Sequence, residues 1–173
     1  YGLPGGAPAG ASDSKMPDMQ AGWEQMCSNV IAGLSGLNMV YEAAGMHASL
    51  LGFCHESLIL SDDIIGQALR CVRGIEVTDE TLALDQMAQV CMGGPGHYLG
   101  TNQTLSRMQS DFVYPKLGDR TSPKEWVELE KPDLLVKATK RKDEILSGVS
   151  AARFNPQLDM NLREAHKIHL QPQ

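Results

Sequence analysis

The sequence has no uninterrupted apolar run of the roughly 18 residues that a membrane-spanning helix requires. It is also poor in positive charge: 15 Lys and Arg stand against 21 Asp and Glu, which gives a net charge of -6. A nucleic-acid-binding surface normally needs an excess of basic residues. No charged and then apolar leader marks the chain for export. We therefore expect a cytoplasmic protein with neither nucleic-acid nor membrane partners.

Cysteines are few and widely separated. Cys27, Cys54, Cys71 and Cys91 form no Cys-x-x-Cys pair, which argues against a zinc site and against a disulfide framework. We expect buried free thiols, as is usual in a reducing compartment, and no bound metal. Aromatic residues make up only 5% of the chain, whereas the nine methionines indicate an adaptable helical interior.

Glycine, proline and alanine are instead concentrated in the first fifteen residues, which end in the polar run Ser12-Asp-Ser-Lys15. Met16-Pro-Asp18 then opens a predicted helix, because proline suits a first helical turn. A glycine-rich loop before a helix suits a binding or reaction site, since glycine lets a ligand approach the main chain. It is not a phosphate-binding P-loop, because Lys15 follows Gly10 five residues on. The same composition also fits a simple turn between a strand and a helix.

The residues after this loop predict a helix and then a strand. Apolar residues recur at helical spacing at Met19, Trp23, Met26 and Val30. Gly36 ends the helix, Leu37-Asn-Met-Val-Tyr41 is a short buried strand, and Glu42-Ala-Ala-Gly45 is the turn after it. The order loop, helix, strand, loop is typical of an α/β protein with parallel strands.

The remainder of the chain predicts mostly helices. Residues 46–60 are ambiguous, but Ser61 is expected to cap a helix that Gly74 closes. Further helix starts are predicted at Thr78, at Thr101 or Asn102, at Ser122-Pro123 and at Pro132-Asp133. The basic residues of the last of these helices, expected on a solvated face, are Lys137, Lys140, Arg141 and Lys142. Beyond Gly148 the chain is expected to be weakly ordered or helical, with breaks at Pro156 and Pro172.

Four stretches of the sequence resemble the trimethylamine methyltransferase family, the corrinoid-dependent methyltransferases that act on methylated amines. They are Tyr1-Gly-Leu-Pro4 running into Ser12-Asp-Ser-Lys15 and Pro17-Asp-x-Gln-Ala-Gly22; Leu69 to Val77, with Arg73-Gly-Ile-Glu-Val77; Thr78 to Leu84; and Gly94-x-Gly-His-Tyr-Leu-Gly100 with Thr104-Leu105. Trp126 and the run from Lys140 to Leu146 look like the end of the family's sequence. The resemblance thus covers about residues 1 to 147.

The resemblance implies the fold of a TIM (β/α)8 barrel, which typically needs about 250 residues. Because 173 residues cannot hold all of it, we expect an α/β chain that forms the C-terminal part of such a barrel, followed by a helical extension. Residues 1–75 would be the last strand and helix units, residues 76–173 would be the extension, and the rest of the barrel would lie upstream. We expect the intact protein to be a homo-oligomer.

The resemblance also implies a methyl transfer to the cobalt of a corrinoid that a partner protein carries, with no cofactor bound directly. In the trimethylamine-specific members pyrrolysine occupies the glycine-rich loop, at the position that Ala11 takes here. Alanine cannot form the adduct that the pyrrolysine imine makes with an amine. A neutral tertiary amine would then have to expel an amide anion, whereas a quaternary ammonium leaves as a neutral amine. The chemistry favours a quaternary amine such as glycine betaine; trimethylamine itself, or a non-catalytic scaffold, remain as alternatives.

A cationic trimethylammonium group favours aromatic faces and a carboxylate at some distance. We assign Ala11 and Asp13 to the catalytic loop, and a betaine carboxylate would accept hydrogen bonds from histidines or from the N–H groups of that loop. The expected substrate-binding residues are Tyr41 and Glu42 at the end of the predicted strand, His55 and Glu56, and His97 and Tyr98. Each also has a structural interpretation: a cap or ion pair for Asp13, a strand end and turn for Tyr41 and Glu42, a helix surface for His55 and Glu56, and packing of the second glycine turn for His97 and Tyr98.

Overall fold

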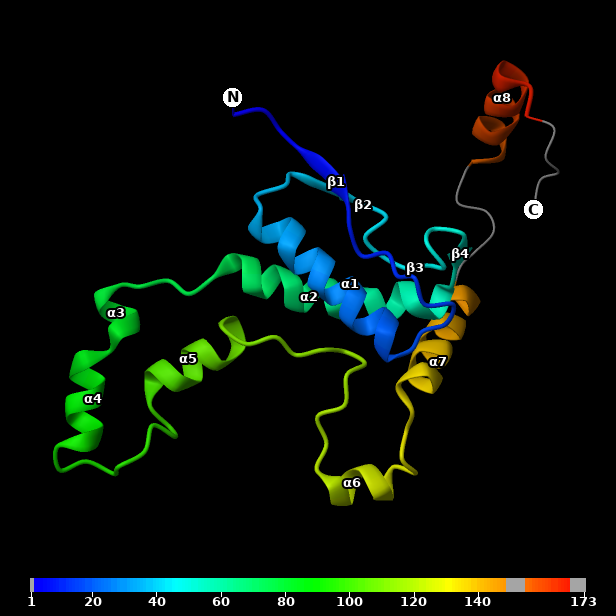
Figure 1. Cartoon of the computed structure of the whole chain (residues 1–173). Coiled ribbons are helices and arrows are strands. Elements are labelled where there is room, and N and C mark those ends of the chain that lie inside the picture. Colours follow the sequence, from blue (N-terminus) through cyan, green and yellow to red (C-terminus); the bar gives the residue numbers. More distant parts are fainter. Residues whose placement is uncertain (1, 149–154, 169–173) are drawn as a thin grey trace.

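The computed structural model describes residues 2–148 and 155–168 and contains both helices and small β-sheets (Figure 1). Two long helices and the strands lie together, and shorter helices follow on extended connections (Figure 1). In chain order the elements are β1 (Gly6–Pro8), α1 (Met19–Leu34), β2 (Met39–Tyr41), β3 (Met46–His47), β4 (Gly52–Phe53), α2 (His55–Arg73), α3 (Asp79–Leu82), α4 (Leu84–Cys91), α5 (Asn102–Ser110), α6 (Pro123–Glu128), α7 (Leu134–Ser147) and α8 (Pro156–His166). Helix and sheet together agree with the α/β class, and the TIM barrel stays a prediction, as do the domain limits at residues 75 and 76.

The glycine-rich start of the chain forms a strand as well as a loop. Strand β1 pairs in parallel with β2, and Pro8 lies opposite Tyr41. The parallel strands on either side of α1 agree with the predicted order of elements. The strand β1 itself was not predicted, because glycine and proline are depleted in strands. The expectation of a buried second strand is wrong: Met39 and Tyr41 are 65% and 45% exposed, since nothing in the described part of the chain covers that side of the pair.

Helix α1 starts later than the sequence predicts. Asp18 is its N-cap and accepts the Ala21 N–H at 2.9 Å, so Pro17 precedes the cap instead of lying in the first turn. Of the four residues of the predicted apolar face, Met19 and Trp23 are 80% and 58% exposed, whereas Met26 and Val30 are half-buried. The buried residues of the helix are small or polar: Ala21, Gln25, Asn29 and Ala32. They are buried because α1 packs on α2.

Helix α2 begins at His55, six residues before the predicted cap at Ser61. Ser61 is fully buried in the middle of the helix, where its Oγ donates to the Ser57 carbonyl oxygen at 2.7 Å. A serine inside a helix can bond back to the preceding turn in this way, so it resembles a cap signal in the sequence. Gly74 closes the helix at a φ of +69°, as predicted.

The caps of the later helices agree with the sequence. The cap residues Thr78, Thr101, Ser122 and Asp133 each accept a backbone N–H of the helix that follows. The solvated face expected for α7 is wrong at Lys142, whose side chain is only 23% exposed because it pairs with Glu56 of α2. Pro156 is at the start of α8, where its fixed φ is compatible with a first turn. Tyr1 and Pro172 lie outside the described residues.

Cysteine burial is also not as expected. The four thiols are free, but Cys27, Cys71 and Cys91 are exposed and Cys54 is half-buried. Their helices present those positions to solvent, because the buried faces of α1 and α2 consist of alanine, serine and amide side chains. None of the helices that the structure describes is long and apolar enough to cross a membrane.

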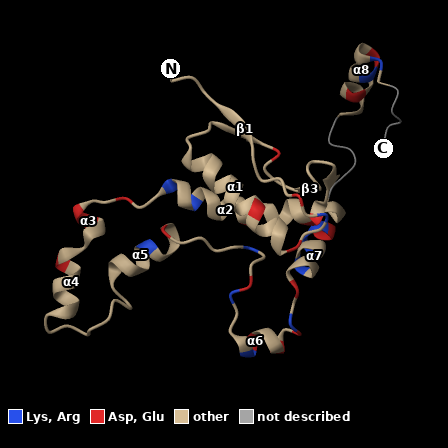
Figure 2. Ribbon diagram, in the orientation of Figure 1, with Lys and Arg blue, Asp and Glu red and all other residues tan. Residues whose placement is uncertain are grey.

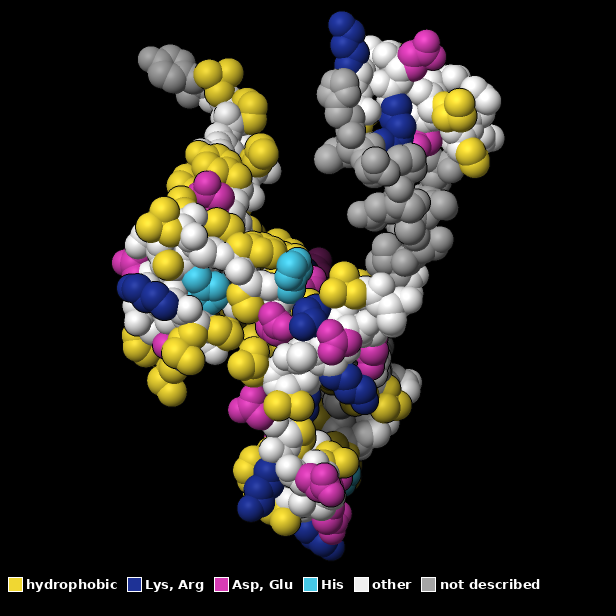
Figure 3. Space-filling view, turned by 90° about the vertical axis from the view of Figure 1, so that its right-hand side faces the viewer, with side chains coloured by type: hydrophobic (Ala, Val, Ile, Leu, Met, Phe, Trp, Pro, Cys, Tyr) yellow, Lys and Arg dark blue, Asp and Glu magenta, His cyan; other side chains and the backbone are white. Residues whose placement is uncertain are grey.

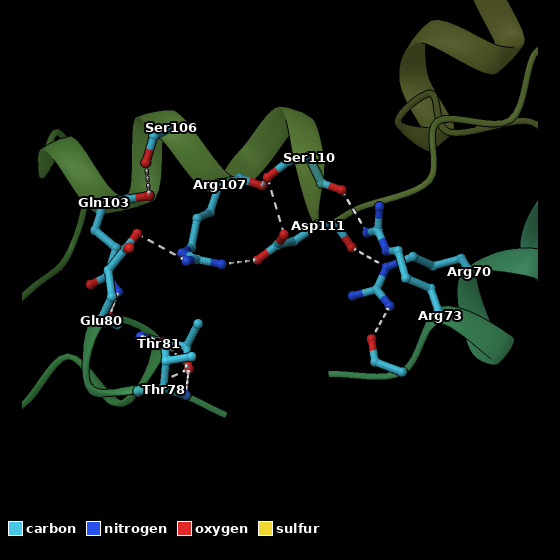
Figure 4. A network of polar contacts seen from close by, with 11 residues as sticks. Arg70, Arg73, Thr78, Glu80, Thr81, Gln103, Ser106, Arg107, Ser110 and Asp111 are labelled. Carbon is cyan, nitrogen blue, oxygen red and sulfur yellow. Dashed lines mark hydrogen bonds and ion pairs between the residues drawn. The ribbon is translucent and has the colours of Figure 1, made fainter. Parts of the chain in front are cut away.

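Polar contacts attach helix α5 and the residues that follow it to helix α2. Arg70 Nε donates to the Asp111 carbonyl at 2.6 Å, and Arg73 Nη2 donates to the Ser110 carbonyl at 2.6 Å (Figure 4). Arg107 of α5 pairs with Glu80 at 3.0 Å and with Asp111 at 3.3 Å. These bonds hold the C-terminal end of α5 against the C-terminal end of α2.

A second polar contact lies nearer the N-terminal end of α2. The Asp63 carboxylate accepts the backbone N–H groups of Lys116, Leu117 and Gly118 at 2.9, 2.8 and 3.2 Å. Helices α6 and α7 carry both basic and acidic residues (Figure 2). The segment between α5 and α6 is therefore held to α2 through its main chain.

We predict that Gly10→Ala lowers the free energy of unfolding by more than about 1 kcal/mol. Gly10 has a φ of +82°, and a Cβ added there would collide with the Ala43 carbonyl and lie 2.7 Å from the Asn29 side-chain nitrogen. The measurement is urea denaturation. The matched control is Gly22→Ala, where nothing lies within 4 Å of the added Cβ and where alanine in a helix is expected to stabilise by about 0.5–1 kcal/mol. Equal midpoints for both variants would contradict the prediction.

Candidate functional site

The glycine-rich loop runs from the end of β1 across α1 and past β3. Gly10 N–H donates to Ser28 Oγ of α1 at 2.8 Å, and Ser12 N–H donates to the Met46 carbonyl of β3 at 3.1 Å. Ser12 and Ser14 are buried, while Ala11 between Gly10 and Ser12 is half-buried. The backbone N–H and C=O of Ala11 make no hydrogen bond within the described part of the chain. The loop thus has pinned flanks and an open centre.

Glu24 of α1 binds the second half of this loop. Its Oε2 accepts both the Ser12 hydroxyl at 2.6 Å and the Asp13 N–H at 2.9 Å, and Oε1 accepts Gln20 Nε2 at 2.9 Å. The bonds from Ser12, Gln20 and the Asp13 N–H lower the pKa of Glu24, so the carboxylate is ionised at neutral pH. Sequence reasoning missed Glu24, because nothing in the local pattern pairs it with a loop eleven residues earlier.

A left-handed turn between β3 and β4 contacts the same loop. Ala48, Ser49 and Leu50 have φ values of +50°, +56° and +71°. Such a conformation costs roughly 1–2 kcal/mol per residue in side chains other than glycine. Ser49 Oγ donates to Asp13 Oδ1 at 2.6 Å, Ser49 N–H to the Ser12 carbonyl at 3.2 Å, and Ala48 N–H to the Ser14 carbonyl at 2.9 Å. The strained turn is therefore fastened to the candidate catalytic loop.

Buried polar residues lie behind the loop. His47 is 4% exposed and its Nε2 is 2.5 Å from Ser57 Oγ of α2. Ser61 Oγ accepts the Gly45 N–H at 3.2 Å and lies 3.1 Å from the Gln25 side-chain oxygen. These residues were not predicted, since a histidine or serine in the sequence does not reveal its burial. They join β3, α1 and α2 behind the candidate site.

Tyr41 and Glu42 lie beside the glycine-rich loop. The Tyr41 carbonyl accepts the Ala9 N–H at 3.2 Å, so the chain after β2 runs along the chain that leads to Ala11. Both side chains are exposed, and Glu42 has a φ of +61°. The structure thus brings the main chain at Tyr41 beside Ala9, two residues before Ala11, while the Tyr41 ring lies 3.5 Å from the position of a Cβ added to Gly6 in β1. Their role in substrate binding stays a prediction.

His55 and Glu56 lie in the first turn of α2, and the contacts of their side chains are structural. The His55 ring meets the Phe53 ring edge-on, with centroids 5.3 Å apart. Glu56 Oε1 is 2.7 Å from Lys142 Nζ, and Oε2 accepts the Cys54 thiol at 3.3 Å. The bond from Lys142 is the main cause that lowers the pKa of Glu56 to about 2. This ion pair joins α2 to α7.

His97 and Tyr98 lie on the exposed second glycine turn, between α4 and α5. Tyr98 Oη is 3.7 Å from Cys91 Sγ, and the neighbouring thiol raises the pKa of Tyr98. Figure 1 shows this turn at the far side of the molecule from β1 and β2. The structure does not bring His97 and Tyr98 to Ala11.

A cavity of about 510 Å³ lies between α1, α2 and the start of α7. Gln25 and Ser57 are among the residues that line it, and Ala11 and Tyr41 are not. Hydrophobic side chains gather below the N-terminal strand on the face that Figure 3 shows. The polar cluster behind the loop thus separates the candidate site from this cavity.

A glycine-rich loop between parallel strands, bonded to the helix that follows it, is consistent with an α/β protein. The family itself comes from comparison. The trimethylamine methyltransferase (MTTB) family matches residues 1–168, and the chain belongs to this family.

Individual relatives agree with this family. The chain is 31% identical over 163 residues to a glycine betaine methyltransferase of Desulfitobacterium hafniense strain Y51, which covers 94% of this chain and 33% of the relative. It is 35% identical over 147 residues to the trimethylamine methyltransferase MttB2 of Methanosarcina mazei, with 84% of this chain and 29% of the relative covered. The chain therefore spans about a third of the length of these curated relatives.

We predict that Glu56→Gln destabilises the protein at neutral pH, and that its difference from the wild type shrinks in acid. The folded-state pKa of Glu56, about 2, lies below the ordinary value of 4.5. The stability that the carboxylate contributes is therefore present above about pH 4.5 and is lost as the pH falls towards about 2. Thermal unfolding of both proteins between pH 7 and the acid range measures this.

The control for that measurement is Glu128→Gln, because Glu128 is exposed and its distance to Lys124 is 3.8 Å. Exposed pairs of this kind contribute little to stability. A difference between wild type and Glu56→Gln that stays constant over the whole pH range would show that the charge of Glu56 is not the stabilising feature.

Proposed function

We propose that a full-length protein containing this chain transfers a methyl group from a quaternary amine, such as glycine betaine, to the cobalt of a corrinoid carried by a partner protein. The observation that carries the proposal is the pinned loop with Ala11 at its open centre, in a chain of the trimethylamine methyltransferase family. Ala11 stands where the trimethylamine-specific members are expected to have pyrrolysine. A substrate that needs no covalent activation suits such a loop.

The charges around Ala11 support a cationic substrate. Asp13, Glu24 and Glu42 are carried by the loop or by segments hydrogen-bonded to it, whereas Lys15 is the one basic residue of the loop itself. Tyr41 of β2, whose exposed ring lies beside Gly6 of β1, is the aromatic side chain that we assign to a trimethylammonium group. An acidic and aromatic environment of this kind favours a quaternary ammonium over an anion.

The carboxylate of a betaine needs hydrogen-bond donors. The Ala11 N–H makes no hydrogen bond among the described residues and lies at the centre of the loop, so it is available to such a group. A charge-assisted bond to a backbone N–H is stronger than a neutral one. The loop would thereby orient the substrate with its methyl groups towards the acceptor.

The reaction is a displacement at carbon. The reduced corrinoid is the co-substrate, and its cobalt supplies the electron pair that forms the new bond to the methyl carbon. The carbon–nitrogen bond breaks, its electron pair stays on nitrogen, and a neutral tertiary amine leaves. No proton has to be moved, which is consistent with a loop that presents alanine instead of a reactive side chain. The protein's part is to position the ammonium and to exclude water.

The surroundings of this loop in the full-length protein are part of the proposal. We propose that β1, α1 and β2 belong to a TIM barrel and that the protein is a homo-oligomer. In such a barrel the ends of parallel strands carry the active site, and Tyr41 and Glu42 come at the end of β2.

The test incubates the full-length protein with a reduced corrinoid protein and, separately, with glycine betaine, other betaines and trimethylamine. Methylation of the cobalt is followed by its absorbance. We expect methylation with a betaine and none with trimethylamine. Methylation with trimethylamine alone would overturn the quaternary substrate, and the absence of methylation with every substrate would favour a scaffold function.

A substitution of Tyr41 tests where the substrate binds. Tyr41→Leu is expected to lower kcat/KM for the betaine at least about tenfold, because a desolvated cation–aromatic contact is worth on the order of 2 kcal/mol. Tyr114→Leu is the control, since Tyr114 is similarly exposed but lies between α5 and α6. Equal loss in both variants would show that the effect is not specific to the site.

A further inference from the structure

We propose that Glu24 and Ser49 are positioning residues that clamp the Ala11–Asp13 loop from two sides and so fix the place where substrate binds. The inference rests on the proposed function. Neither residue belongs to the loop: Glu24 is in α1, and Ser49 is in the left-handed turn between β3 and β4. Both meet the loop at Asp13, the residue two positions after Ala11.

The first side of the clamp is the Glu24 carboxylate, which accepts hydrogen bonds from three neutral donors. Glu24 Oε2 accepts the Ser12 hydroxyl at 2.6 Å and the Asp13 N–H at 2.9 Å, and Gln20 occupies Oε1 at 2.9 Å. No lysine or arginine pairs with Glu24 in the part of the chain that the structure describes. The charge of Glu24 is therefore directed at the loop, where charge-assisted bonds are short and strong.

The second side is the strained turn. Ser49 Oγ donates to Asp13 Oδ1 at 2.6 Å, and the N–H groups of Ala48 and Ser49 donate to the Ser14 and Ser12 carbonyls. Three successive residues with positive φ persist only where the surroundings hold them. Here the turn directs two N–H groups and one hydroxyl towards the same short loop.

The two sides act on opposite parts of the same residue. The Glu24 carboxylate accepts a hydrogen bond from the main-chain N–H of Asp13, and the Ser49 hydroxyl donates one to the side-chain oxygen of Asp13. Asp13 can then neither rotate nor shift without breaking one of these bonds. Because Ala11 has no hydrogen bond of its own among the described residues, its position is set by these neighbours and by Gly10.

The first measurement is hydrogen–deuterium exchange of the full-length protein, read on peptides that cover residues 10–15. Glu24→Ala and Ser49→Ala are each expected to speed exchange there at least about tenfold. Ser49→Ala is the more informative variant, because it leaves the Asp13 N–H its acceptor on Glu24. The matched controls are Glu128→Ala and Ser106→Ala, whose side chains lie in α6 and α5 and do not contact the loop.

A rescue separates the hydrogen bond from general stability. Ser49→Asn keeps a side-chain donor and tolerates a positive φ, so it is expected to retain slow exchange at residues 10–15. Unchanged exchange in both Glu24→Ala and Ser49→Ala would overturn the clamp. Rapid exchange throughout α2 as well would mean that the variant had lost its fold, and Ser49→Asn against Ser49→Ala then decides the question.

The second measurement is methyl transfer from glycine betaine. We expect Ser49→Ala to lower kcat at least about tenfold with less than about a threefold change in KM, because the loop still binds but no longer holds the substrate in line. Faster exchange with unchanged kcat would overturn the positioning role. If the wild type transfers no methyl group, the proposed function and the clamp's role in it fail, whereas the exchange result still decides whether the clamp holds the loop.

Discussion

The contact between α1 and α2 is made by small and polar side chains, and the position of the candidate site depends on it. Ser61 on α2 lies within hydrogen-bonding distance of Gln25 on α1 and of the Gly45 N–H before β3. Hydrogen bonds are directional, so this junction accepts one arrangement of the three segments, where an apolar junction would tolerate several. The position of the glycine-rich loop is fixed by that arrangement, because the loop is hydrogen-bonded both to α1 and to β3.

Large apolar side chains lie mostly outside this junction. The buried apolar residues among those described are Ala9, Ala21, Ala32, Ala68, Val90 and Ala138, whereas Met19, Trp23 and Leu34 are all more than half exposed. Exposed apolar surface of this extent is typical of faces that proteins bury in interfaces. The chain spans about a third of its curated relatives, and a further part of such a protein would find this surface available. Helix α1 thus has a polar side towards α2 and an apolar side still open.

The sequence predicts best what depends on neighbouring residues. The caps at Thr78, Ser122 and Asp133 and the closing Gly74 were all found, because a cap bonds to an N–H two or three residues away. The family was found for a related reason, since its motifs are short and local. Burial and long-range pairing were not found. Ser61 looked like a cap but is buried, and the partners of Glu24 and Ser49 lie 11 to 36 residues distant.

The bonds by which α2 holds the later segments have a consequence for how the sequence can change. Arg70 and Arg73 bind main-chain carbonyl groups, which every residue supplies. Asp63 binds main-chain N–H groups, which every residue except proline supplies. These bonds therefore place little constraint on the side chains at positions 110, 116 and 117. Selection on the attachment would fall on three side chains of one helix. Substitutions should accumulate unevenly: freely along the held segment, and rarely at those three positions of α2.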